Sequence, residues 1–168
     1  MLRRPKGAGA YLPICLLDRA LAIGHSARVL LASKEVWPMH AQVCILNSAW
    51  QDYPQWTTGG EAVAYRAESL VDPDRPPFPG FAVATRPDVG PGSAGPVLVE
   101  VMRDEVPADL TLVHQSSLYI SDGGVKVGNE ESGLLAVDLP RGTWALQIWV
   151  DSQVPAEVSR VTFVVTAP

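Results

Sequence analysis

Alternation of apolar and polar residues in the second half of the chain is the feature that most narrows the possible folds. Apolar side chains occupy every second position in 97–101, 144–150 and 161–165. A period of two residues is that of a β-strand with one buried face. The residues that we expect to be buried on this basis are Val99, Val101, Trp144, Leu146, Ile148, Val161, Phe163 and Val165. Trp149 falls on the opposite face of its strand, so we expect it to be more exposed than Trp144.

Three further segments predict strands. In 110–121, one face carries Leu110, Leu112, Leu118 and Ile120, and His114 lies in register with them as a core or half-buried residue. The segments Ala27–Ser33 and Ala41–Ser48 are apolar on both faces, which is typical of central strands.

Two turn sequences suggest how strands are joined. Asp122-Gly123-Gly124 has the composition of a hairpin turn. Leu139-Pro140-Arg141-Gly142 suits a type I turn followed by a left-handed glycine. The second turn predicts that Leu134–Leu139 pairs antiparallel with Thr143–Val150.

The expected fold class is therefore all-β: an antiparallel β-sandwich or open barrel of roughly 8–10 short strands, with at most one or two short helices. Two segments stay ambiguous between helix and strand, namely Ile14–Ile23 and the stretch from Thr58 to Leu70. For the second of these, β-branched and aromatic residues favour strands.

A chain of 168 residues is one domain on the usual length prior. Within a single domain 1–168, we expect residues 1–10 to form a flexible basic tail. Residues 72–96 contain seven prolines and four glycines, which predicts a long loop with little regular structure beyond Phe81–Thr85. No apolar run is long enough to span a membrane. The apolar stretch that follows the basic start is short and interrupted, so we expect a cytoplasmic protein.

Charge is unevenly distributed along the sequence. The net charge is −5, and residues 61–168 hold seven basic and fifteen acidic side chains. A basic stripe with interleaved aromatics is missing, which argues against a nucleic-acid partner. An acidic surface steers association with a basic protein. The alternative, that the charge only keeps the protein soluble, stays open.

Motifs for catalysis or metal binding are missing from the sequence. His25, His40 and His114 have no metal-ligand spacing, and no nucleophile elbow or phosphate loop occurs. Cys15 and Cys44 lie in apolar runs, where free thiols are usually buried and inert. We expect no catalytic residue, no metal and no cofactor, so a binding protein rather than an enzyme.

One aromatic cluster stands out as a candidate binding site. Trp50, Asp52, Tyr53 and Trp56 fall within seven residues, in a segment that reads as loop. Exposed aromatic residues are the usual anchors of protein interfaces and of sugar platforms. In the alternative interpretation, the two tryptophans fold back and cap the core.

The segment from Leu134 to Trp149 resembles the closing hairpin of the competence protein J family, through its Asp-Leu-Pro-Arg-Gly-Thr-Trp sequence. This resemblance implies a small intracellular β protein that binds and inhibits a nuclease. The leading hypothesis is a bacterial inhibitor or immunity-type protein that occludes a basic toxin or nuclease. The alternatives are a β module that binds a small ligand or a carbohydrate, and a metal-dependent enzyme on a β-barrel that uses His25, His40 or His114.

Overall fold

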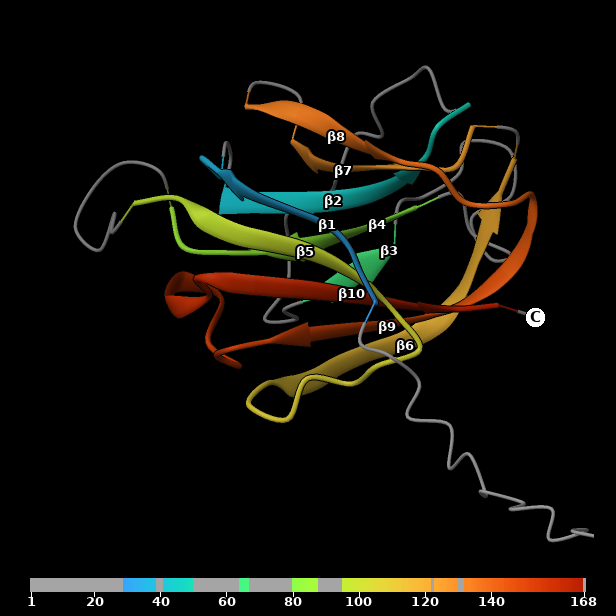
Figure 1. Cartoon of the computed structure of the whole chain (residues 1–168). Coiled ribbons are helices and arrows are strands. Elements are labelled where there is room, and N and C mark those ends of the chain that lie inside the picture. Colours follow the sequence, from blue (N-terminus) through green and yellow to red (C-terminus); the bar gives the residue numbers. More distant parts are fainter. Residues whose placement is uncertain are drawn as a thin grey trace, which may run out of the picture.

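In the described part of the chain, two five-stranded sheets pack face to face (Figure 1). The computed structural model describes residues 29–38, 41–49, 64–66, 80–87, 95–121, 123–129 and 132–167. Sheet A has the strand order β1-β5-β10-β9-β6, and sheet B has the order β3-β4-β2-β7-β8. The strands are β1 (Val29–Val36), β2 (Gln42–Asn47), β3 (Ala64–Arg66), β4 (Gly80–Ala84), β5 (Val97–Arg103), β6 (Thr111–Ile120), β7 (Val125–Asn129), β8 (Gly133–Val137), β9 (Gly142–Val150) and β10 (Arg160–Thr166). The expected all-β sandwich is confirmed.

The core lies between the two sheets and is built from the alternating apolar residues. All eight residues that the period-two pattern marks as buried are at most 3% exposed. Trp149 is only half-buried, as expected, while Trp144 on the inner face is 3% exposed. Sheet B contributes Val43, Ile45, Phe81 and Val83 to the same cluster. The sequence pattern therefore predicts correctly which faces of β5, β9 and β10 are buried.

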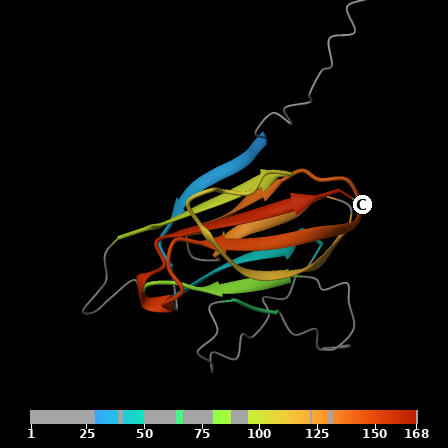
Figure 2. The same cartoon turned by 90° about the horizontal axis from the view of Figure 1, so that it is seen from below.

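β10 lies in the centre of sheet A. It pairs parallel with β5 and antiparallel with β9, and the other described strand pairs are antiparallel. Figure 2 shows β10 and β9 side by side within one layer. A short 3₁₀ turn, η2 (Pro155–Glu157), lies in the connection between them. No helix within the described ranges is long and apolar enough to cross a membrane.

The hairpin expected at Leu139–Gly142 is wrong. β8 pairs with β7 in sheet B, whereas β9 pairs with β6 and β10 in sheet A. The turn therefore carries the chain from one sheet to the other. Leu139 is buried on the way, and the indole Nε1 of Trp144 donates to the carbonyl oxygen of Pro140 at 2.9 Å. The same correction applies to the turn at 122–124, since β6 belongs to sheet A and β7 to sheet B.

Gly124 lies where the connection from β6 to β7 packs closely against the connection from β8 to β9. Its φ is +76°, and a Cβ built on it would lie 2.0 Å from the carbonyl oxygen of Val137. Only glycine fits a backbone with this conformation and this close neighbour. The sequence thus marks the turn correctly but not the strands that it joins, because turn composition does not encode the sheet of the following strand.

The two segments that are apolar on both faces behave differently. β2 is buried along its whole length in the middle of sheet B, so the central strand expected at Ala41–Ser48 is confirmed. β1, which covers most of Ala27–Ser33, is an edge strand of sheet A with exposed residues, so that expectation is wrong. Its inward-pointing Lys34 donates to the carbonyl oxygens of Ser132 and Gly133. A polar side chain of this kind is typical of edge strands.

The structure also tests the expected apolar face of 110–121 and the strands expected around Phe81–Thr85 and before Leu70. The register of β6 against β9 shifts between Leu112 and His114, so Leu112 is 39% exposed while Leu118 is buried. The shared face expected for 110–121 is therefore interrupted by a bulge.

β4 occupies 80–84 within the Pro/Gly-rich segment, and β3 forms a strand in the ambiguous stretch before Leu70. Ile14–Ile23 lies outside the described residues.

Candidate binding surface

The aromatic cluster predicted as a site lies outside the described residues. Trp50, Asp52, Tyr53 and Trp56 all fall in 50–63, so their arrangement stays a prediction. The residues directly before the cluster are described, and Asn47 at the end of β2 is buried there.

Asn47 connects the residues that follow β2 with the end of β6 through hydrogen bonds. Its Oδ1 accepts hydrogen bonds from the backbone N–H of Ala49 and from the backbone N–H and hydroxyl of Ser121, the last at 2.6 Å. Three donors on one buried amide oxygen satisfy these polar groups and fix the direction in which the chain leaves β2.

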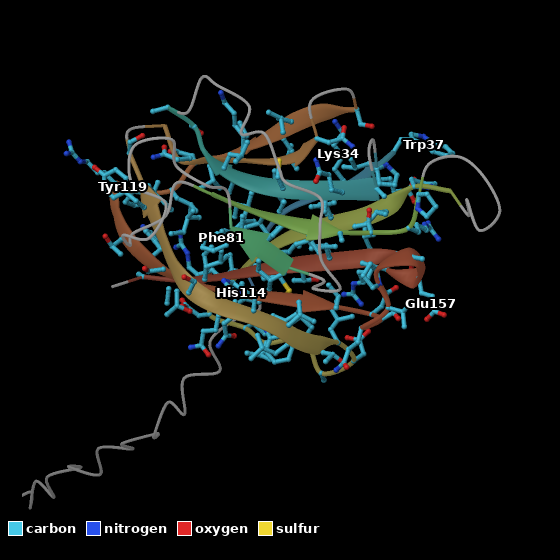
Figure 3. The ribbon with its side chains drawn as sticks, turned by 180° about the vertical axis from the view of Figure 1, so that it is seen from behind. Lys34, Trp37, Phe81, His114, Tyr119 and Glu157 are labelled. Atoms are coloured by element: carbon cyan, nitrogen blue, oxygen red, sulfur yellow. The ribbon has the colours of Figure 1, made fainter. Side chains whose placement is uncertain are left out.

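Of the three histidines considered as metal ligands, His114 is the one within the described residues. His114 faces the opposite sheet from β6, with its ring centroid 5.1 Å from that of Phe81 (Figure 3). His25 and His40 lie outside the described residues. Among the residues that are described, no group of three His, Cys, Asp or Glu side chains could hold a metal ion.

Cys44 is buried on β2, and its thiol donates to the carbonyl oxygen of Gly128 at 3.1 Å. Its burial agrees with the prediction of a core thiol, while Cys15 lies outside the described residues. A buried thiol of this kind serves packing rather than chemistry.

The outer face of sheet A carries a connected polar network. Glu100 on β5 accepts from Arg160 Nε at 2.8 Å and from the hydroxyl of Thr162 at 3.0 Å. The same guanidinium pairs through Nη1 with Asp109, whose side chain is 69% exposed. The hydrogen bond to Glu100 is the main reason why the pKa of Arg160 is raised, with further attraction from Asp109. The network therefore fixes three charged side chains on one face of the sheet.

Asp151 orders the connection between β9 and β10 beside this network. Burial acts to raise the pKa of the Asp151 carboxyl. Hydrogen bonds from the hydroxyl and backbone N–H of Ser159 and from the backbone N–H of Arg160 outweigh burial, so the pKa lies below its ordinary value of 3.8. The group is therefore a stable anion at neutral pH.

An exposed tryptophan that the sequence analysis did not single out lies at the end of β1. Trp37 is 55% exposed, yet its carbonyl oxygen accepts from Asn129 Nδ2 and from the hydroxyl of Ser132. The backbone N–H of Ser132 donates in turn to Asn129 Oδ1 at 2.7 Å. The backbone of Trp37 is thus fixed while its ring faces solvent. The alternation ending at Val36 gives its outward direction, but only the tertiary clamp shows that its backbone is held.

The described fold has a solved counterpart. ComJ from Bacillus subtilis, an inhibitor of the DNA-degrading activity of NucA, matches with a TM-score of 0.57 over 84% of this chain and 98% of that chain. The fold is ComJ-like. The two chains are 11% identical, so this structural similarity shows a shared fold and nothing further. No protein-family model matches the sequence, and no curated protein matches it either.

Proposed function

We propose that this chain is a non-enzymatic binding protein of the inhibitor type, acting in the bacterial cytoplasm on a basic nuclease or toxin. The observation that carries this proposal is the ComJ-like fold, which extends over nearly the whole of a known nuclease inhibitor. Fold alone does not determine function, so the proposal also draws on the chemistry of the surface.

Occlusion is the mechanism that this chemistry supports. An inhibitor of this kind covers the active site of its partner with a rigid surface and contributes no reacting group. Acidic side chains would meet the basic rim that a nuclease presents to DNA, because that rim is built to attract phosphates. Trp50, Tyr53 and Trp56 are the proposed aromatic anchors, with Asp52 as an acidic contact among them.

The test is to co-express the chain with the product of each flanking gene and to follow complex formation by size-exclusion chromatography with light scattering. Degradation of DNA by the flanking product is then measured with and without the purified chain. The proposal predicts a stable complex and DNA degradation that falls to zero as the chain approaches stoichiometric amounts. If neither flanking product forms a complex, or if the complex degrades DNA at the full rate, the inhibitor function is wrong.

The aromatic anchors are tested on the same complex. Trp56→Ala should weaken binding by about 2 kcal/mol, as truncation of a hot-spot residue does, with little change in melting temperature. Val106→Ala, at an exposed apolar position between β5 and β6, is the matched control and should change neither quantity. A Trp56→Ala variant that melts earlier but binds with unchanged affinity would show that the ring caps the core instead.

A further inference from the structure

We propose that the outer face of sheet A is a docking surface for a basic protein partner. This inference rests on the proposed function and adds to it a second contact surface, separate from the aromatic cluster at 50–56. The outer face of sheet A is covered at its central strand β10, where Thr162 and Val164 are at most 2% exposed, and is accessible at β9 and β6. Outward-facing residues on β2 and β4, such as Cys44, Leu46 and Ala82, are at most 4% exposed, so sheet B presents little of its outer face at these strands.

Sheet A instead keeps large apolar side chains accessible on the outer face of β9 and β6. One row across the strands runs from Glu100 through Thr162 and Trp149 to Leu112. Trp149 is half-buried and Leu112 is exposed, because the bulge in β6 turns Leu112 outward. Leu30 on β1 is exposed as well. Apolar residues that are rimmed by polar ones are typical of an interaction surface.

Charge defines the kind of partner that this face fits. The carboxylates on the face and at its adjoining end are Glu35, Glu100, Asp109, Asp151 and Glu157. The described cations at this end are Arg160, which is paired with two of these carboxylates, and Lys34 and Arg86, which donate to backbone carbonyls. Five carboxylates against three cations leave the surface acidic.

The opposite end of the sandwich shows that this excess is local. Figure 3 places Trp37 and Glu157 toward one end of the molecule and Tyr119 toward the other. The described charged side chains near the Tyr119 end are Asp104, Glu105 and Asp138, together with Arg103, Lys126 and Arg141. Because that end carries equal numbers of acidic and basic described side chains, it does not favour a partner of either charge. The acidic end of sheet A would instead attract a basic surface.

The face is also held rigid before any partner binds. Glu100 and Thr162 lie on paired strands, and Arg160 is fixed between two carboxylates. At the corner of the face, the clamp from Asn129 and Ser132 fixes the backbone of Trp37. Because these groups are ordered in the free protein, docking immobilises few side chains, and this lowers the entropic cost of association.

The experiment uses the full chain and the flanking-gene product that it binds. Glu35→Lys reverses one exposed charge on the face, and Asp138→Lys reverses one exposed charge near the other end, so the two variants have the same net charge. Glu35→Lys should lower the association rate constant by about three- to tenfold at low salt, with dissociation unchanged. Asp138→Lys should leave both rate constants near the wild-type values.

A second pair of variants tests the apolar part of the surface. Leu112→Ser should raise the Kd by about fivefold or more, while Leu134→Ser, at a partly exposed position on β8 of sheet B, should not. Melting temperatures of all four variants, measured by circular dichroism, separate an effect on binding from an effect on folding. A pair of matched variants with equal rate constants and equal Kd values would overturn the docking surface.

The remaining outcomes separate this inference from the proposed function. If the wild-type chain inhibits its partner and the face variants inhibit equally well, the docking surface is wrong and the inhibitor function stands. If the wild-type chain binds neither flanking product, both fall together. If light scattering shows a dimer of the free chain that Glu35→Lys dissociates, the face belongs to a second copy and the basic partner is wrong.

Discussion

Replacing Trp144 by alanine should be one of the most destabilising single changes in sheet A. The ring is 3% exposed on the inner face of β9, and the guanidinium of Arg103 lies 5.7 Å from its centroid. Truncation of a buried tryptophan to alanine leaves a large cavity and costs about 3–5 kcal/mol. The hydrogen bond from Nε1 to Pro140 contributes about 1 kcal/mol within that figure, because the freed carbonyl lies at an exposed residue and can bind water.

Two comparison variants divide this loss into its parts. Trp144→Phe keeps most of the ring and loses the hydrogen bond, so about 1–2 kcal/mol is expected. Trp149→Ala removes a half-buried ring from the outer face and should cost at most about 2 kcal/mol. The assay is urea unfolding followed by far-ultraviolet circular dichroism, with the slope of the transition checked for constancy. If Trp149→Ala costs as much as Trp144→Ala, the register of β9 is shifted by one residue and the assignment of its faces is wrong.

Three further predictions follow from single contacts. Gly124→Ala should destabilise the protein by more than about 2 kcal/mol in urea unfolding, because its Cβ would collide with the carbonyl of Val137; Gly123→Ala, with φ +96° and no such collision, should cost only about 1 kcal/mol. Asp151→Asn should lower the melting temperature at neutral pH, and the difference should shrink as the pH falls below about 3.8, since a lowered pKa stabilises the fold only while the carboxylate is ionised; a difference that is constant with pH contradicts this. Cys44 should resist alkylation in the native protein and react fully in urea, as read by peptide mass spectrometry, and rapid native labelling would contradict its burial.

Alternation predicts which face of a strand is buried, and it does so correctly wherever the backbone is regular. Val99, Phe163 and Ile148 occupy the core as expected. The pattern fails at Leu112 because a bulge in β6 turns this side chain to the outer face. A single inserted residue cannot be recognised from the apolar pattern of a short strand.

Strand partners were harder to predict than strand faces. The link from β8 to β9 has the residues of a hairpin turn, but it crosses between sheets, and Leu139 is buried in that crossing. Pairing depends on long-range packing, whereas turn chemistry is local. The edge position of β1 escaped prediction for the same reason, since an apolar strand at an edge and one at a centre differ mainly in their neighbours.

The two proposed binding surfaces differ in how far the sequence could predict them. Aromatic residues beside turn residues are visible in the sequence, and the cluster at 50–56, which lies outside the described residues, is predicted in that way. The outer face of sheet A joins residues from five strands, such as Glu35 on β1 and Trp149 on β9, and only the strand order brings them together. Trp37 was missed because the clamp that fixes its backbone comes from Asn129 and Ser132, more than ninety positions along the chain.

The central position of β10 has a consequence for biosynthesis. Residues 160–166 supply the strand that joins β5 to β9, so sheet A stays in two separate parts until the ribosome has made nearly the whole described chain. During that interval β5 lacks its parallel partner and β9 has one open edge, which are the conditions under which nascent β proteins aggregate. Pairing of β5 with β10 also closes a loop of more than fifty residues, and such distant pairing makes folding slow. Sheet A therefore becomes one continuous sheet only after β10, the last of the described strands, has been synthesised.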